Sequence, residues 1–301
     1  MDPTVVIRGH RLRNAVMTAS GCAGWGREMN RFFDLSRLGA FVTPSVTVSA
    51  QVGTDAPRIL ETPAGLVWDT ALPNPGAAVV AVRELAWLGS VGAAVILSVA
   101  GGSSSEFAEV AQRLRASDAF GCVIALEVNL TVGNGSTAGS RFDEDALAAA
   151  TVVGRVREQL PRDIAVVAKL AVDAPDLVGV AAACVEAGAD ALTIGHGPAG
   201  MALQVHAGRR EGATVVGRVS GPATRPQAAL AVHGLHQAMI AGRMERATII
   251  GAGGVRSAGD ARELLSVGAA AVQVGSATFA DPGAPVRVID DLAAPRRSRT
   301  A

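Results

Sequence analysis

The chain has 301 residues, with 27 basic and 27 acidic side chains, no formal net charge and a pI near 7.0. This balance, with an aromatic content of only 3%, argues against a nucleic-acid-binding protein, which needs a basic surface and stacking side chains. Hydrophobic residues make up 49% of the chain and the mean hydropathy is +0.32, which excludes a disordered protein.

No apolar run reaches the ~18 residues that span a bilayer, and the first residues lack the basic and apolar regions of a secretory signal. The three cysteines, Cys22, Cys122 and Cys184, are widely spaced and form no metal-binding pattern. We therefore expect a cytoplasmic protein that holds no metal ion and binds neither membranes nor nucleic acid.

Short apolar runs recur along the chain, and they are typical of strands buried on both faces of a parallel sheet because they do not alternate with polar residues. They lie at 15–19, 41–43, 94–99, 123–129, 165–170, 191–194, 248–250 and 271–274. Helical patterns lie between them at 107–115, 144–159, 177–187, 227–241 and 258–266.

Eight strand–helix units in a chain of this length predict an α/β fold, a single (β/α)₈ TIM barrel over 1–294. A doubly wound sheet is the alternative, but it needs a G-x-G-x-x-G motif after the first strand, which is lacking. Segments 4–8 and 11–13 predict a short hairpin, and the long segments 44–76 and 195–226 are expected to cover the barrel mouth. The basic segment 295–301 is expected to be a disordered tail.

The loops after the last two strands are rich in glycine and serine. Gly253 and Gly254 follow the seventh strand, and Gly275 and Ser276 follow the eighth. Barrels commonly bind phosphate at this place through backbone N–H groups and a helix N-terminus. The pattern predicts a phosphate site, although the same glycines also suit tight turns.

Lys169 is the sole lysine of the chain, and it ends the fifth predicted strand. Elsewhere arginine carries the basic charge, so a surviving lysine indicates a place where a compact ammonium fits and a guanidinium does not. Chance survival at a surface is the alternative. At a barrel mouth Lys169 can form a Schiff base, hold a phosphate or lie beside an electron-accepting ring. The small, amide-rich mouth favours the ring, and hence a flavin.

A series of motifs resembles the dihydroorotate dehydrogenases, and most closely the bacterial class 1B catalytic subunit. The motifs are ASGC-x-G-x-G at 19–26, PR at 57–58, NPG at 74–76, VAG at 99–101, E-x-N at 127–129, Asn134, KL at 169–170, SGPA at 220–223, GAGGV at 251–255 and VGSA-x-FADP at 274–282. The resemblance implies a barrel that binds FMN. By position it assigns to the flavin Ala19, Ser20, Gly21, Ser45, Asn129, Lys169, Ser220, Gly221, Gly253, Gly254, Gly275 and Ser276.

The substrate half of the motif series differs from the family. Pro44 stands where the family carries a lysine that contacts flavin and substrate, and Val132 stands where its catalytic cysteine takes a proton. His196 replaces an asparagine that binds the product, so His196 and Thr131 are the candidate catalytic residues. The expected substrate-binding residues are Asn74, Asn129, Asn134 and His196, with loop-fixing hydrogen bonds as the alternative for the asparagines.

The leading hypothesis is an FMN-dependent oxidoreductase that acts on an altered small cyclic substrate. Three alternatives stay open: an authentic dihydroorotate dehydrogenase of pyrimidine biosynthesis with a substitute base, a non-catalytic FMN-binding protein, and a phosphate-binding barrel without flavin. The resemblance also implies a homodimer and an electron-transfer partner subunit that carries FAD and an iron–sulfur centre, because this chain has no cysteine cluster of its own.

Overall fold

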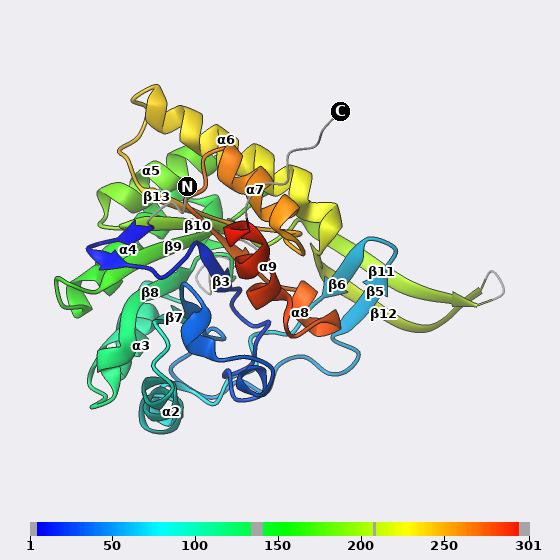
Figure 1. Ribbon diagram of the computed structural model, residues 1–301, viewed down its shortest axis with the longest axis horizontal. Coiled ribbons are helices and arrows are strands. Elements are labelled where there is room, and N and C mark those ends of the chain that lie inside the picture. Colours follow the sequence, from blue (N-terminus) through cyan, green and yellow to red (C-terminus); the bar gives the residue numbers. More distant parts are fainter. Residues whose placement is uncertain (1–4, 134–140, 207–208, 295–301) are drawn as a thin grey trace.

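The computed structural model describes residues 5–133, 141–206 and 209–294. Within them, eight parallel strands form one sheet (Figure 1). In spatial order they are β3 (Val16–Thr18), β14 (Ala271–Val274), β13 (Thr248–Ala252), β10 (Ala191–Gly195), β9 (Ala165–Ala171), β8 (Val123–Asn129), β7 (Val95–Val99) and β4 (Phe41–Val42). A parallel bridge between Met17 and Ala40 joins the two outer strands, so the sheet curls into a barrel. The predicted (β/α)₈ fold is confirmed.

Helices predicted from the sequence surround this barrel, with ends displaced by a few residues. They are α3 (Ser104–Arg115), α4 (Ala146–Gln159), α5 (Leu177–Glu186), α6 (Arg225–Ile240) and α7 (Ala258–Ser266). Side-chain caps fix several starts, because an oxygen at the N-cap accepts a bond from an otherwise unpaired N–H. Ser103 accepts from Glu106 N, Asp145 accepts from Leu147 N, and Ser257 with Asp260 forms a capping box.

Further helices were not predicted. A continuous helical stretch comprises α1 (Ala77–Val79), the π-helical η3 (Val80–Glu84) and α2 (Leu85–Ser90), and α8 (Ala277–Ala280) and α9 (Ala284–Ala293) follow the last strand. Between β8 and α4 lies a short 3₁₀ helix, η5 (Phe142–Glu144), so α4 begins at Ala146 rather than at the predicted residue 144.

The two long segments expected at the mouth contain a sheet that the sequence did not predict. They form a four-stranded antiparallel sheet in the order β11 (Ala199–His206), β12 (Arg209–Ser220), β6 (Gly65–Trp68) and β5 (Ile59–Thr62). Figure 1 shows these strands grouped at one side of the barrel. Glycine permits the close pairing, because a Cβ at Gly217 would collide with the carbonyl oxygen of Trp68.

The opposite end of the barrel is closed by the predicted hairpin, seen here as β1 (Val6–Ile7) and β2 (His10–Arg11). Ile7 and Leu12 pack with residues at the beginnings of the strands, such as Ala165 and Ala271, in a small buried cluster. This apolar plug leaves the carboxyl ends of the strands as the open end of the barrel. Asn134 and the predicted tail 295–301 lie outside the described residues.

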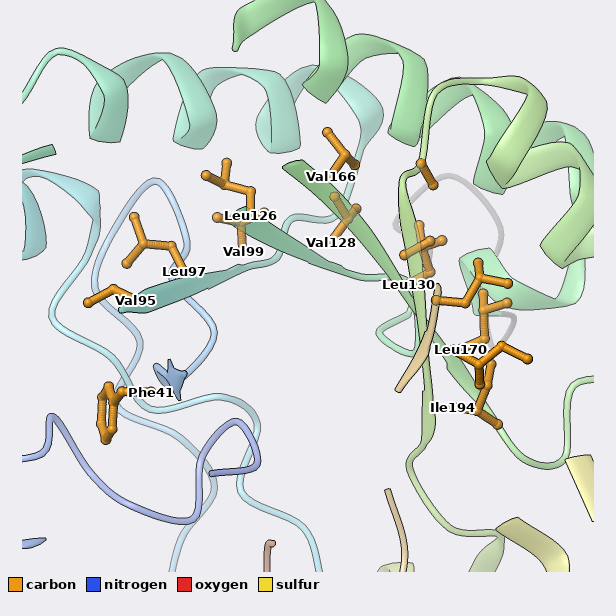
Figure 2. Packing of buried hydrophobic residues seen from close by; sticks show 14 of the residues in the cluster. Phe41, Val95, Leu97, Val99, Leu126, Val128, Leu130, Val166, Leu170 and Ile194 are labelled. Atoms are coloured by element: carbon orange, nitrogen blue, oxygen red, sulfur yellow. The ribbon is translucent and has the colours of Figure 1, made fainter. Parts of the chain in front are cut away.

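The main core fills the layer between the sheet and the helices, and Figure 2 shows its strand side chains, among them Leu97, Leu126 and Val166. Phe107 of α3 is fully buried there and meets Phe142 edge to face, with ring centroids 5.5 Å apart. Such aromatic pairs contribute large buried areas to a core.

Replacing Phe107 with alanine is expected to lower the free energy of unfolding by about 3–5 kcal/mol, because a large cavity replaces a packed ring. Phe32→Ala is the matched control, since the Phe32 side chain is 64% exposed and its loss is expected to change stability by less than about 0.5 kcal/mol. Urea unfolding followed by circular dichroism measures both. Equal effects of the two substitutions would contradict the packing of α3 described here.

Candidate active site

A cavity of about 1110 Å³ opens at the carboxyl ends of the barrel strands. All of the residues that the sequence assigned to a flavin line it: Ala19, Ser20, Gly21, Ser45, Asn129, Lys169, Ser220, Gly221, Gly253, Gly254, Gly275 and Ser276. The candidate catalytic residues Thr131 and His196 line it too. The volume slightly exceeds the ~300–1,000 Å³ of typical ligand pockets, so a cofactor and a small substrate fit together.

Asn74 is the described site residue that the structure does not place on the cavity wall. Its Oδ1 accepts bonds from Thr47 N (3.2 Å) and Gly76 N (2.9 Å), and its Nδ2 donates to Leu72 O (2.9 Å). These bonds fix the loop that precedes α1. The structure therefore gives Asn74 the loop-fixing arrangement, and Asn134 lies outside the described residues.

Lys169 is held inside the barrel by a buried polar cluster. Its Nζ lies 3.3 Å from Oε1 of Glu127, which is completely buried on the neighbouring strand β8. The other oxygen of Glu127 accepts bonds from Thr193 Oγ1 (2.9 Å) and Gln273 Nε2 (2.8 Å). The Glu127 carboxylate is thus held by side chains from β10 and β14. It pairs in turn with the Lys169 ammonium of β9 at the cavity floor. Among the described atoms, Oε1 of Gln273 has no hydrogen-bond partner.

A chain of hydrogen bonds runs along the cavity wall from β8. The amide of Asn129 donates to Ser45 Oγ (3.0 Å), and Ser45 Oγ lies 2.9 Å from Ser98 Oγ. Thr131 Oγ1 donates to Oδ1 of Asn129 at 2.6 Å. These bonds hold the Asn129 amide in one orientation, as a fixed contact for a polar ring.

The glycine-rich loops form a narrow cradle beside the start of α6. Gly221 and Gly254 have φ values of +94° and +67°, in the left-handed region that glycine adopts readily. A Cβ on Gly254 would lie 2.9 Å from Cβ of Arg225 and 3.0 Å from the carbonyl oxygen of Gly221. Only bare backbone fits here, at the N-terminus of a long helix, which is the arrangement that binds a phosphate.

His196 follows β10 and lines the cavity. Its backbone is left-handed (φ +59°), and its ring meets Trp68 edge to face at 5.4 Å between centroids. Burial, followed by the charges of Arg218, Lys169 and Arg141, lowers the pKa of His196 well below its usual 6.5. His196 is therefore a neutral imidazole at physiological pH, able to accept a proton.

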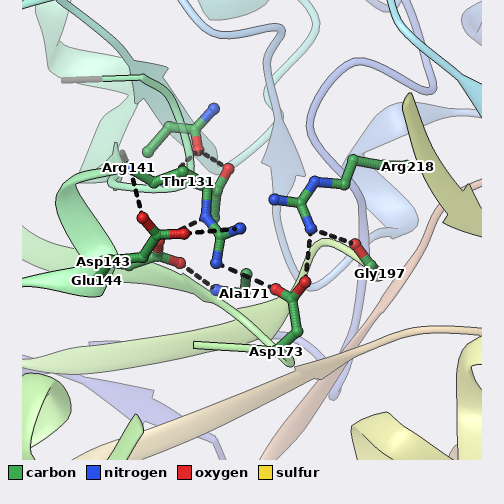
Figure 3. Close-up of polar contacts among 9 residues, drawn as sticks. Thr131, Arg141, Asp143, Glu144, Ala171, Asp173, Gly197 and Arg218 are labelled. Carbon is green, nitrogen blue, oxygen red and sulfur yellow. Dashed lines mark hydrogen bonds and ion pairs between the residues drawn. The ribbon is translucent and has the colours of Figure 1, made fainter. Parts of the chain in front are cut away.

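Arg218 and Trp68 are cavity residues that the sequence analysis did not identify. They face each other across β12 and β6, so their side chains leave the same face of the antiparallel sheet. The sequence signal for the strand of Arg218 was the β-branched residues at 214–216 and 219, which lay inside the long segment 195–226. Figure 3 shows Arg218 with its partners Asp173 and Gly197, near the cluster of Arg141, Asp143 and Glu144.

Cys22 also lines the cavity, and burial raises the pKa of its thiol to about 11. The thiol is protonated at neutral pH, so it is not a reactive nucleophile there. No group of three or more His, Cys, Asp or Glu side chains in the described parts of the chain is arranged to hold a metal ion. Over the same residues, no helix has both the length and the apolar character of a membrane span.

Comparison with known proteins agrees with this site. A family model described as dihydroorotate dehydrogenase matches residues 4–295. A dihydroorotate dehydrogenase B (NAD(+)) catalytic subunit from Geotalea daltonii is 40% identical over 283 residues, which cover 94% of this chain and 89% of that protein. The same subunit from Trichlorobacter lovleyi is 38% identical over 289 residues, 96% of this chain and 91% of that protein. The chain belongs to the dihydroorotate dehydrogenase family.

The resemblance inferred from the motifs, and with it the prediction of an oxidoreductase, is thus confirmed. Within the dihydroorotate dehydrogenase barrel, the residues that depart from the expected pattern lie together. Pro44, Val132 and His196 all line the cavity. Neither Pro44 nor Val132 has a side chain that carries charge or exchanges a proton, so His196 is the titratable newcomer of this group.

The lowered pKa of His196 predicts a pH-dependent stability difference. Below pH 6.5 the unfolded chain binds a proton at this residue that the folded chain does not, so folding loses stability as the pH falls. The slope attributable to His196 approaches about 1.4 kcal/mol per pH unit and vanishes above its unfolded pKa.

The measurement compares urea unfolding of the wild type and a His196→Asn variant from about pH 5 to about pH 8. The wild type is expected to lose more stability than the variant on the acid side, with parallel curves above pH 6.5. If the difference in free energy of unfolding between the wild type and the variant does not change with pH, the neutral state of the His196 imidazole is refuted.

Proposed function

We propose that this chain is an FMN-dependent oxidoreductase that oxidises a CH–CH bond of a small cyclic substrate, with His196 as the proton acceptor. The observation that carries the proposal is the composition of one cavity. Lys169, the glycine cradle and the neutral imidazole of His196 all line it. We further propose that the substrate differs from dihydroorotate, because Pro44 and Val132 replace the substrate lysine and the catalytic cysteine expected from the family.

The residues of the cavity suit FMN in three respects. The loops of Gly221, Gly253 and Gly254 accept a phosphate where a Cβ would not fit. The fixed amide of Asn129 and the buried acceptor of Gln273 offer hydrogen bonds to a polar ring. Lys169 places a positive charge that stabilises negative charge on such a ring. When bound, FMN supplies the two-electron acceptor for the hydride that leaves one substrate carbon.

Oxidation of a CH–CH bond to a double bond also releases a proton from the neighbouring carbon, and a base must take it. His196 is neutral and lies at the cavity wall. Thr131 is a poorer candidate because its hydroxyl donates a hydrogen bond to Asn129 Oδ1, which is not a base. Among the described residues, no basic group accepts the hydroxyl proton and so activates Thr131. A positioned base contributes about 10²–10⁴-fold to such a step.

The electrons must then leave the site. The relatives are described as catalytic subunits of an NAD(+) enzyme, and we propose by analogy that a separate electron-transfer subunit accepts them from this chain. The homodimer and the cytoplasmic location expected from the sequence stay predictions, to be checked by light scattering and by cell fractionation.

The first test measures bound flavin and its reduction. We expect the purified protein to bind about one FMN per chain and to lose its flavin absorbance anaerobically with a cyclic amide substrate. The panel contains dihydroorotate, dihydrouracil and other saturated cyclic amides. A protein that takes up no FMN would refute the proposal, and bound FMN that no compound bleaches would indicate a non-catalytic protein. Rapid bleaching by dihydroorotate would instead identify an authentic dihydroorotate dehydrogenase with a substitute base.

The second test addresses the base. His196→Ala is expected to slow flavin bleaching by about 10²–10⁴-fold while FMN stays bound, and Thr131→Val is expected to slow it by less than about tenfold. His233→Ala is the matched control, because His233 is exposed on α6 and is expected to leave the rate unchanged. A large loss of the bleaching rate in Thr131→Val, together with an unchanged rate in His196→Ala, would identify Thr131 as the base.

A further inference from the structure

The cavity has lost one expected cation and contains another that the family motifs do not include. Pro44 lines the wall where the resemblance implies a lysine. Among the described residues of the cavity wall, Lys169 and Arg218 are the ones that carry a permanent positive charge. Lys169 is bound to Glu127 at the floor, inside the barrel. Arg218 is therefore the cation available at the His196 end.

The antiparallel sheet directs Arg218 to this place. Arg218 pairs with Trp68 across the two strands, and the Trp68 ring contacts the ring of His196. Its Nη1 also lies 3.3 Å from the carbonyl oxygen of Gly197, the residue after His196. The guanidinium is thus fixed beside the candidate base from two directions, and only 15% of its side chain is exposed.

The bonds of Arg218 to the described residues leave part of its guanidinium available. Within that part of the chain, its hydrogen bonds to Asp173 Oδ2 (2.7 Å) and to Gly197 O use the same nitrogen, Nη1. In Figure 3 the other terminal nitrogen points away from Asp173. A guanidinium has five N–H donors in a planar fork that matches a carboxylate, so donors remain for a ligand.

Arg218 belongs to an ion-pair cluster in which its partner Asp173 is shared, because Oδ1 of Asp173 also pairs with Nη2 of Arg141 at 3.1 Å. Arg141 pairs in addition with Asp143 and Glu144. Among these residues Arg218 lines the cavity, whereas the carboxylates do not. Arg218 is also the first of the cations that disfavour a proton on His196. An anionic group inside the cavity therefore meets the guanidinium before it meets the carboxylates.

We propose that Arg218 binds the anionic group of the cyclic substrate, a carboxylate. Arg218 then supplies the positive charge that the family's lysine would supply at the position of Pro44. The proposal rests on the proposed function for the location of the substrate. It makes Arg218 a specificity-determining residue that holds the ring against His196. Asp173 is a positioning residue, since it orients the fork without reaching the substrate.

The test compares two ligands with the same ring, orotate with a carboxylate and uracil without one. Affinities are measured by titration calorimetry on protein supplied with FMN. We expect the wild type to bind orotate more tightly than uracil. Arg218→Gln is expected to lower the affinity for orotate by about 10- to 100-fold and to change the affinity for uracil by less than about threefold. The reason is that only orotate loses a charged partner. Arg218→Lys, which keeps the charge but not the fork, is expected to give an intermediate loss.

Arg141→Gln is the matched control, because Arg141 shares Asp173 but is not part of the cavity wall. It is expected to leave the ratio of the two affinities nearly unchanged. The thermal unfolding temperature of each variant is also measured without ligand. Loss of a merely structural ion pair lowers that temperature, whereas loss of a ligand contact changes the ratio of the two affinities. The proposal is overturned if Arg218→Gln weakens both ligands equally, if Arg141→Gln has the same effect, or if wild-type protein with bound FMN does not prefer orotate. Failure to bind FMN would instead refute the proposed function.

Discussion

The ion pair between Lys169 and Glu127 is the constraint around which the barrel interior is organised. A buried charge pair is stable only where its remaining donors and acceptors are satisfied, because the loss of hydration is large. Here Thr193 and Gln273, each from a different strand, bond to Oε2 of Glu127, and Lys169 lies 3.3 Å from Oε1. The registers of β8, β9, β10 and β14 must therefore agree for one carboxylate to be satisfied. The same agreement places the ammonium at the floor of the cavity.

The cavity divides into two walls of different origin. The floor and the phosphate cradle come from strand ends and βα loops, which the barrel holds rigidly through its parallel hydrogen bonds. The other wall comes from the antiparallel sheet, which contributes Trp68 and Arg218 through a long-range strand pair. The departures from the family occur on both walls, because Pro44, Val132 and His196 lie in loops after barrel strands, whereas Trp68 and Arg218 lie on the antiparallel sheet. Loops and an added sheet can change without altering the strand pairs that close the barrel.

The barrel was predictable because continuous apolar runs, glycine at helix ends and polar caps are local signals. The residues that the resemblance assigned to a flavin were correctly expected to lie together, since most of them lie at or just after a strand end and the strand ends meet at one edge, and their contact with a flavin stays a prediction. Arg218 and Trp68 are 150 positions apart in the sequence, and only the pairing of β12 with β6 brings them together. Glycines at 200, 212 and 217 hid these strands, because glycine lowers strand propensity although it permits the close approach of backbones. The ion pair of Glu127 was equally invisible, because a carboxylate within an apolar run carries no signal of its partner.

Charge at the His196 end connects the two proposals physically. Three cations and burial keep the imidazole neutral, which preserves it as a proton acceptor but makes it a weak one. A carboxylate bound to Arg218 would offset part of that positive field and raise the pKa of His196 toward its usual value. The base would then become stronger when an anionic substrate is in place, and stay neutral and unprotonated when the cavity is empty. A neutral substrate would leave the field unchanged. Recognition of the anion and competence for proton transfer would thus depend on the same guanidinium.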